Sequence, residues 1–450
     1  MLFRSVLGIG VVSPEFVRAF GTQNRMRQAI CMNLGIQFTT LPIILYYYYE
    51  IPLYSLLLNL VLVPGMSLVL CCGLLGLFSS FFGLFAGRFL GAGAMVLLTC
   101  YEKAASFTIR LPFANLCWGQ PALWEIMVYY LVLGVVVLVL HKMNESKDKF
   151  LKEEVYLYGE YGWEDKVNRC CLAVLLMFCM LLKYHPQEEL KITMLDVGQG
   201  DSMVIEQRKG GVYLVDGGST DVKQVGTYRI LPFLKAEGIE KIQGIFISHM
   251  DFDHICGIKE LLECQAKGEV QIECVYLPDI GGKDEVYEEM EKQIREQNIE
   301  IKYLSRGMEL EHQGMKLKIL QPIKGESYEG RNEYSMVFQL DFQEFSMLFT
   351  GDVEGKGEEE LLVSGQLEKV NILKAAHHGS EYTMCEEVLE QIHPKATWIS
   401  CGEKNSYGHP HKALLERIKA LNSEIYVTMK EGAITVETDG THMIIYEKCK

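Results

Sequence analysis

The chain has 450 residues, a net charge of −15 at neutral pH and 49% hydrophobic residues, and its length predicts two or more folding units. These averages hide two different halves, because residues 1–185 have a net charge of +3 and residues 186–450 a net charge of −18. The acidic half excludes nucleic-acid binding by overall charge alone, since such binding depends on Lys and Arg that neutralise phosphates. A nucleic-acid function would need local basic patches, metal ions or a partner.

The chain contains 14 cysteines but no C-x-x-C motif, and the pairs Cys71-Cys72 and Cys170-Cys171 lie inside apolar runs. This pattern favours small buried hydrophobic side chains over disulfides or zinc ligands. We expect no cleavable signal peptide, because residues 1–21 lack a sustained apolar core after their first arginine.

Residues 1–185 predict a multi-span membrane region. The uncharged stretch 51–87 is long enough for one span and a broken or re-entrant piece that turns at Pro64-Gly65, since a span needs about 20 apolar residues. Further spans are predicted near 29–49, 121–141 and 168–184, and residues 89–101 are ambiguous.

Cations gather before the first predicted span and again in the loop 141–169. Both segments are therefore expected on the cytoplasmic side, where Lys and Arg are enriched. The span near 168–184 would then carry the chain outward, which predicts an extracytoplasmic position for residues 186–450.

Residues 186–450 show short β-rich runs that alternate with helical segments in two similar series. This order predicts two sheets packed face to face with helices outside. Polar residues gather where the predicted strands end: Asp196, Asp216, His249, Asp352 and His377. Catalytic groups on loops over a rigid scaffold are typical of an enzyme.

The segment SHMDFDH (248–254) has the ligand chemistry of a metal site. His249 and Asp251 are two residues apart, so an extended strand end would point both to one side, while Asp253 and His254 follow the turn. One imidazole with carboxylates is ordinary coordination for zinc or manganese. The alternative is a solvated loop in which Asp253 caps the next helix.

Three further segments favour the metal site. FTGD places Asp352 after an apolar strand, and AAHHGS places His377 and His378 after another. Adjacent residues on a strand point opposite ways, so only one of the two histidines needs to be a ligand and the other is structural or catalytic. His409 lies in the loop NSYGHPH, where a surface residue is the alternative.

The order DVGQGDS, LVDGG, SHMDFDHICG, FTGD, HHGS and NSYGHP resembles the metallo-β-lactamase-fold domain of ComEC-type DNA internalisation proteins, over about residues 190–450. LNLVLVPG (58–65) is similar to the tail of that family's competence region. The resemblance implies a bundle of α-helical transmembrane segments (1–185) followed by an αββα hydrolase domain (186–450). It also implies a metal-dependent nuclease or phosphodiesterase in the bacterial cell membrane that takes part in the uptake of transforming DNA.

The resemblance also implies roles for individual residues. The metal ligands would be His249, Asp251, Asp253, His254, Asp352 and either His377 or His378. The residues with catalytic roles would be Asp253, Asp201, which lines the site, and His409, which contacts phosphate or acts as a general acid. The residues that orient the ligands from behind would be Asp216, Gln199 and Ser380.

Two departures from the wider superfamily affect the expected metal content. Asp251 stands where a histidine is usual, and the segment that normally supplies one more histidine reads RNEYSMVFQL, with Asn332 and Ser335 instead. We therefore expect either a weak first site or a single ion held by Asp253, His254, Asp352 and one of the paired histidines. Oxygen-rich ligation moves the preference from Zn²⁺ toward Mn²⁺.

Members of the family have a longer membrane region and an additional OB-like domain, so the sequence predicts a truncated or split protein whose missing spans come from a separate polypeptide. The expected partners are incoming single-stranded DNA, the lipid bilayer and other DNA-uptake proteins. Two alternatives stay open: a membrane-tethered hydrolase of small phosphodiesters, and a truncated, non-catalytic channel component.

Overall fold

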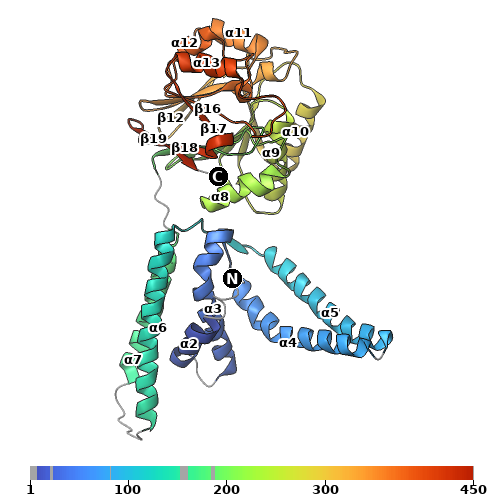
Figure 1. Ribbon diagram of the computed structural model, residues 1–450, viewed down its shortest axis with the longest axis vertical. Coiled ribbons are helices and arrows are strands. Elements are labelled where there is room, and N and C mark those ends of the chain that lie inside the picture. Colours follow the sequence, from blue (N-terminus) through green and yellow to red (C-terminus); the bar gives the residue numbers. More distant parts are fainter. Residues whose placement is uncertain (1–7, 21–23, 82, 153–160, 184–187, 449–450) are drawn as a thin grey trace. The chain divides into compact units, whose positions relative to one another are not determined.

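The computed structural model describes residues 8–20, 24–81, 83–152, 161–183 and 188–448 (Figure 1). Contacts divide the chain into a helical unit, residues 1–185 with 235–238, and an acidic unit, residues 186–234 with 239–450. Each unit has its own core, and each is described by itself below.

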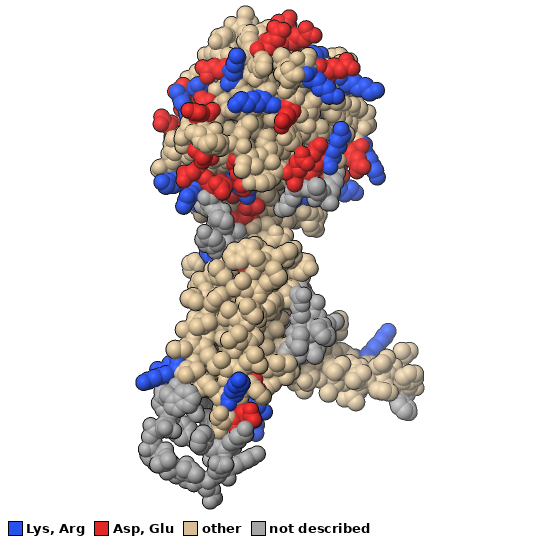
Figure 2. All heavy atoms as spheres, turned by 60° about the vertical axis from the view of Figure 1, so that its left-hand side comes forward, with Lys and Arg blue, Asp and Glu red and all other residues tan. Residues whose placement is uncertain are grey.

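The described part of the helical unit consists of η1 (Gly8–Val12), α2 (Ser13–Phe20), α3 (Arg25–Tyr48), α4 (Ser55–Ser80), α5 (Leu84–Ile109), α6 (Leu123–Lys152) and α7 (Tyr161–Leu181). A short antiparallel pair, β1 (Glu50–Pro52) and β2 (Asn115–Cys117), joins two of its connections. Among the described residues, three helical segments are long and apolar enough to cross a membrane: Arg25–Tyr48, Ser55–Ser80 and Leu123–Ser146. Figure 2 shows a mostly uncharged surface along this unit.

The expected break at Pro64-Gly65 is wrong, because α4 continues through Pro64 to Ser80. A proline removes its own N–H bond and crowds the carbonyl four residues earlier, but a helix in an apolar surrounding can continue when its other backbone bonds are made. The chain turns back after Ser80 instead, so the ambiguous residues 89–101 lie within α5.

Helices α4 and α5 form a hairpin held together by small residues. A Cβ atom on Gly76 would come within 2.9 Å of the Gly91 nitrogen, and one on Gly87 within 2.8 Å of Ser80 Cβ. This close approach is how membrane helices associate where lipid offers no hydrophobic driving force. The predicted span near 168–184 falls largely on α7, and its last residue, like residues 185–187, lies outside the described part.

The acidic unit contains two large sheets. The order of the first is β10-β9-β7-β5-β4-β3-β18-β19 and the order of the second is β11-β12-β13-β14-β15-β16-β17. The first contains β3 (Leu190–Met194), β4 (Met203–Gln207), β5 (Gly211–Val215), β7 (Gly244–Phe246), β9 (Cys274–Pro278), β10 (Glu300–Leu304), β18 (Ala433–Thr438) and β19 (Met443–Lys448). The second contains β11 (Glu309–His312), β12 (Met315–Gln321), β13 (Val337–Phe342), β14 (Phe345–Phe349), β15 (Ile372–Lys374), β16 (Ala396–Ile399) and β17 (Glu424–Val427).

Helical segments and a minor strand pair complete this unit. They are β6 (Lys241–Ile242) with β8 (Gln271–Ile272), η2 (Gly226–Ile230), α8 (Leu231–Ala236), α9 (Phe252–Ala266), α10 (Glu285–Glu296), η3 (Asn332–Tyr334), α11 (Gly355–Val363), η4 (Ala376–Gly379), α12 (Glu386–Ile392), α13 (Lys412–Ala420) and α14 (Thr428–Glu431). Figure 1 shows α9 and α10 on one side of the unit and α11, α12 and α13 on another.

The cores confirm the expected αββα arrangement. Side chains from both sheets, among them Phe246, Phe338 and Trp398, form one buried cluster between them. Two further clusters bury the inner faces of α9 and α10 on the first sheet and of α11, α12 and α13 on the second. Aromatic and β-branched residues favour such buried strands, which explains why these apolar runs form sheets.

Candidate metal centre

The candidate centre forms where neighbouring parallel strands end. β5 and β7 are parallel neighbours in the first sheet, and β14, β15 and β16 are parallel neighbours in the second. The loops after β5, β7, β14 and β15 therefore leave the same edges of the two sheets, and they carry the histidines and aspartates expected as ligands. Placing polar groups on strand-end loops keeps the sheets themselves apolar.

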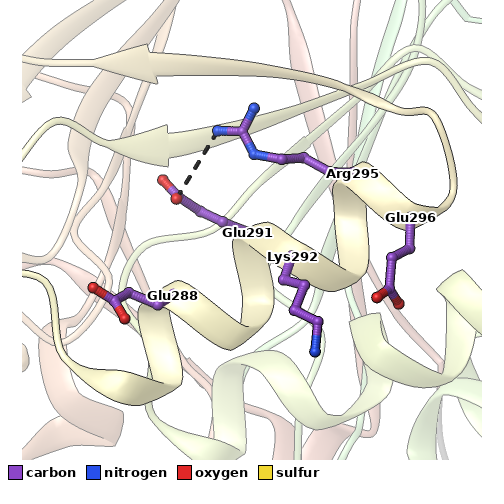
Figure 3. A pocket seen from close by; sticks show the side chains of 5 residues that line it. All are labelled: Glu288, Glu291, Lys292, Arg295 and Glu296. Carbon is purple, nitrogen blue, oxygen red and sulfur yellow. Dashed lines mark ion pairs between the residues drawn. The ribbon is translucent and has the colours of Figure 1, made fainter.

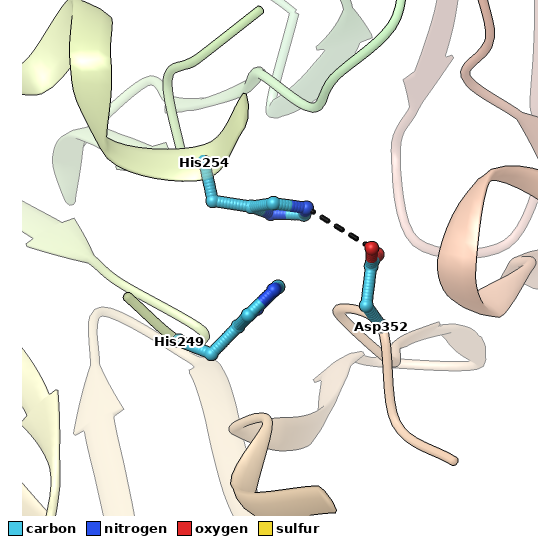
Figure 4. Close-up of side chains that lie close together, drawn as sticks. All are labelled: His249, His254 and Asp352. Carbon is cyan, nitrogen blue, oxygen red and sulfur yellow. Dashed lines mark ion pairs between the residues drawn. The ribbon is translucent and has the colours of Figure 1, made fainter. Parts of the chain in front are cut away.

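Among the described residues, four groups of three side chains each bring their ligand atoms within 4.8 Å of one another. Their members are His249 with His254 and Asp352; Asp253 with His254 and His378; Asp201 with Asp352 and His378; and Asp201 with Asp216 and His254. Figure 4 shows His249, His254 and Asp352 converging from three separate segments. The described part of the chain thus brings together all the expected ligands except Asp251 and His377.

His254 is at the centre of this arrangement and is fully buried. Its Nε2 atom lies 3.2 Å from Asp352 Oδ2, and its Nδ1 atom lies 2.9 Å from Asp216 Oδ2. Burial lowers the pKa of His254, but the carboxylates of Asp352 and Asp216 outweigh burial and raise it well above its usual value. Asp216 also accepts a hydrogen bond from the Ser248 N–H at 2.7 Å, which fixes the carboxylate that orients the imidazole.

The structure distinguishes the two adjacent histidines. Both have a positive φ, 47° at His377 and 54° at His378, so the strand alternation assumed from the sequence does not apply. His378 Nε2 lies 3.2 Å from Asp253 Oδ2 and 3.3 Å from Asp352 Oδ2. His377 turns toward Glu354 instead, with Nδ1 2.9 Å from Oε2. His378 therefore lies among the ligand atoms, and His377 lies beside them.

Lys374 is a member of the centre that the sequence reasoning missed. It is buried at the end of β15, its Nζ donates to the Gly351 carbonyl at 2.8 Å, and it forms ion pairs with Asp201 and, at 3.5 Å, with Asp352. Burial raises the pKa of Asp201, but the positive charge of Lys374 outweighs burial and lowers it. A lone lysine in the apolar run NILKAA was the available signal, because buried charges require partners.

The remaining predicted residues lie around the cluster. Gln199 accepts a hydrogen bond from the Gly402 N–H at 3.2 Å, and Ser380 Oγ accepts one from the Tyr382 N–H at 3.3 Å, so both hold loops in place. His409 is buried, with its ring centroid 6.3 Å from that of His378. Burial and the neighbouring histidines lower the pKa of His409 to about 4.

Asp251 lies at the rim of the centre. Its Oδ1 atom accepts a hydrogen bond from Arg331 Nη1 at 3.0 Å, and its Oδ2 atom lies 3.7 Å from His249 Nε2.

The charged hollow over α10 in Figure 3 shares no residue with the metal centre, and its lining consists of Glu288, Glu291, Lys292, Arg295 and Glu296.

The residues present fit a divalent ion. The Nε2 atoms of His249 and His254 are buried and form no hydrogen bond within the described part of the chain. A buried polar atom without a hydrogen bond costs free energy, and an ion ligated by His254 together with Asp352 would remove that cost at the His254 nitrogen, while His249 Nε2 lies 3.7 Å from Asp251 Oδ2. Mixed imidazole and carboxylate ligands suit zinc and manganese.

We expect Asp216→Asn to weaken Mn²⁺ or Zn²⁺ binding by about 10–100-fold, because an amide cannot orient and polarise His254 as a carboxylate does. Isothermal titration calorimetry on the full chain in detergent measures this loss. Asp439→Asn, in an exposed turn, is the matched control and should leave affinity unchanged. Equal affinities of Asp216→Asn and the unsubstituted chain would show that Asp216 does not support the centre.

Comparisons with known proteins agree with this architecture. Residues 2–143 match the family model described as competence protein, and residues 195–403 match that of the metallo-beta-lactamase superfamily. The chain is 26% identical over 431 residues to ComE operon protein 3 of Bacillus subtilis, covering 90% of this chain and 51% of that protein. It is 28% identical over 272 residues to Recombination protein 2 of Haemophilus influenzae, covering 60% of this chain and 32% of that protein.

Among solved structures, the metallo-beta-lactamase fold protein YhfI from Bacillus subtilis aligns with a TM-score of 0.39 and 12% identity, covering 56% of this chain and all of that one. The chain spans about half the length of its Bacillus relative and about a third of its Haemophilus relative. A competence-protein region followed by a metallo-beta-lactamase domain is the arrangement expected of ComEC-type competence proteins, and the chain is similar to that family over both regions.

Proposed function

We propose that the chain is a membrane-anchored, metal-dependent phosphodiesterase that cleaves single-stranded DNA during the uptake of transforming DNA. The observation that carries this proposal is the buried set of imidazoles and carboxylates around His254. Its members come from loops far apart in the sequence, and within the described part of the chain their charges pair with one another and with Lys374. Such a concentration of ionisable groups with perturbed pKa values is typical of an active site.

Four residues would hold the ion: Asp253, His254, Asp352 and His378. When bound, a divalent ion supplies a Lewis acid that makes water a nucleophile near neutral pH and offsets negative charge on a phosphate oxygen. Asp216 fixes the His254 ring, and Lys374 fixes the carboxylates of Asp201 and Asp352, so these groups keep their positions when substrate arrives.

We expect His409 to contact the substrate. It is buried next to His377 and His378, and its Nδ1 atom has no hydrogen-bond partner in the described part of the chain. Its lowered pKa keeps the ring neutral at pH 7, so one ring nitrogen can donate a hydrogen bond to a phosphate oxygen or to the leaving oxygen.

Exposed aromatic residues favour a nucleic-acid substrate over a small ester. Phe252 lies between Asp251 and Asp253 and is 64% exposed, Tyr382 follows the HHGS loop and is 79% exposed, and Tyr407 is 60% exposed. The Tyr407 ring stacks on His409 with centroids 5.6 Å apart. Aromatic side chains beside a cleavage site provide stacking platforms for unpaired bases, which reduces the need for a basic surface.

As a membrane protein, the chain would cross the bilayer several times, and its acidic unit would lie outside the cytoplasm. Lys142 at the end of the α6 span, together with Lys166 and Arg169 near the start of α7, supports a cytoplasmic loop between these helices. Alkaline phosphatase fused after residue 450 should therefore be active in intact cells, and a fusion after residue 146 should be inactive. The reverse pattern would contradict this orientation.

Asp253→Ala should reduce kcat/KM for single-stranded DNA by roughly a thousandfold or more, because a metal ligand next to His378 is lost. The measurement is release of nucleotides from a labelled oligonucleotide by the full chain in detergent with Mn²⁺. Asp439→Asn serves as the control. Hydrolysis of bis(p-nitrophenyl) phosphate without cleavage of DNA would favour the alternative, a hydrolase of small phosphodiesters.

Tyr407→Ala tests the aromatic contribution. Loss of one stacking partner, worth about 1–3 kcal/mol, should raise KM for single-stranded DNA by about tenfold or more. The rate on bis(p-nitrophenyl) phosphate, which has no base, should stay unchanged, and exposed Tyr228 offers the matched control variant Tyr228→Ala. Equal losses on both substrates would show that Tyr407 stabilises the metal centre and does not stack on a base of the substrate.

A further inference from the structure

One serine hydroxyl lies between two imidazoles of the metal centre. Ser248 Oγ is 2.9 Å from His249 Nδ1 and 3.4 Å from His254 Nδ1. It also donates a hydrogen bond to Asp216 Oδ2 at 2.7 Å. All four side chains are buried, so these contacts do not exchange with contacts to bulk water. Their geometry determines which nitrogen of each ring is committed to a hydrogen bond.

A count of protons fixes the state of the His249 ring. A serine hydroxyl has one proton, and an ionised carboxylate only accepts hydrogen bonds. The short bond from Ser248 to Asp216 therefore uses the Ser248 proton. The 2.9 Å contact between Ser248 Oγ and His249 Nδ1 then needs a proton from the ring. His249 Nδ1 is thus a donor, and only Nε2 can offer a lone pair to a ligand bond.

Asp216 sets the His254 ring in the same way. His254 Nδ1 lies 2.9 Å from Asp216 Oδ2 and carries a proton, because the carboxylate oxygen only accepts. The Nε2 atoms of both rings are buried and form no hydrogen bond within the described part of the chain. His249 Nε2 is 3.7 Å from Asp251 Oδ2, which is too far for a hydrogen bond. Both rings form a ligand group with Asp352.

We propose that Ser248 is a positioning residue, whose hydroxyl commits the Nδ1 atoms of His249 and His254 to hydrogen bonds and leaves both Nε2 atoms for a metal ion. It acts on His249 directly and on His254 through Asp216. The inference rests on the proposed metal-dependent function and adds His249 Nε2 to its ligand atoms. Without the Ser248 hydroxyl, Ser335 Oγ at 3.4 Å would be the remaining acceptor for His249 Nδ1 among the described residues.

Metal affinity tests the role of the hydroxyl. The full chain in detergent is titrated with Zn²⁺ by isothermal titration calorimetry. Ser248→Ala should bind Zn²⁺ about tenfold more weakly or worse, because groups that orient a ligand ring strongly affect metal affinity. Ser248→Thr keeps a hydroxyl and should restore affinity. Ser423→Ala, which removes a buried hydroxyl paired with Thr397, is the matched control and should bind normally. Equal affinity of Ser248→Ala and the unsubstituted chain overturns the role of Ser248.

The protonated nitrogen of His249 is a second readout, and a purely structural role of Ser248 would not change it. Solid-state NMR of the Zn²⁺-loaded chain with ¹⁵N-labelled histidines distinguishes the two ring nitrogens, and the His249 signals are those lost in His249→Gln. We expect a protonated Nδ1 and a metal-bound Nε2. His378, whose Nδ1 lies 3.0 Å from the Ser400 carbonyl, is the internal reference for this pattern. A protonated Nε2 on His249 in the unsubstituted chain refutes the proposal, even if Ser248→Ala does not fold.

These readouts do not depend on hydrolysis, so they separate the two proposals. If the unsubstituted chain cleaves no phosphodiester but Ser248→Ala weakens Zn²⁺ binding and Ser248→Thr restores it, the proposed hydrolysis fails while the role of Ser248 stands. If DNA is cleaved and Ser248→Ala binds Zn²⁺ normally, the proposed hydrolysis stands and the role of Ser248 fails.

Discussion

The acidic unit depends on one buried chain of contacts, Asp352 to His254 to Asp216, with separations of 3.2 Å and 2.9 Å. These residues follow strands of two different sheets, so they meet only when both sheets have formed and faced each other. Burying such charged groups is costly unless each finds a partner. The apolar cluster between the sheets supplies the compensating burial, and the polar groups are confined to one rim of it.

The charged residues around this chain of contacts balance one another. Asp201, Asp216, Asp253 and Asp352 place several carboxylates in a small buried volume, and Lys374 and the imidazoles are the positive groups among them. Removing one partner from a buried pair typically costs about 3–5 kcal/mol, because the other charge is left uncompensated. The site is therefore built as a unit, in which a metal ion would replace protons on the histidines and would not add charge to a neutral pocket.

The rim of the site differs from its buried part, because the charged residues at the rim are partly exposed to solvent. Asp251, Arg331 and Asp284 lie where solvent and substrate can reach them, and Phe252, Tyr382 and Tyr407 expose apolar rings on the neighbouring loops. The rim thus carries exposed aromatic rings and the Arg331 side chain beside the carboxylates of Asp251 and Asp284, while the carboxylates of Asp201, Asp216 and Asp352 are buried below.

The sequence by itself indicated the resemblance to the family, the αββα class and the motif residues, because strand-end motifs such as SHMDFDH and FTGD are local and their residue types predict their chemistry. Only the tertiary structure showed that His378 lies beside Asp253 and Asp352 and that His377 lies beside Glu354, since both histidines adopt a positive φ that no alternation rule predicts. It alone showed that α4 passes through Pro64, because helix continuity depends on surroundings as well as on the proline. Lys374 and Arg331 emerged for the same reason: a charged side chain takes its role from partners that are distant in sequence, Asp201 for one and Asp251 for the other.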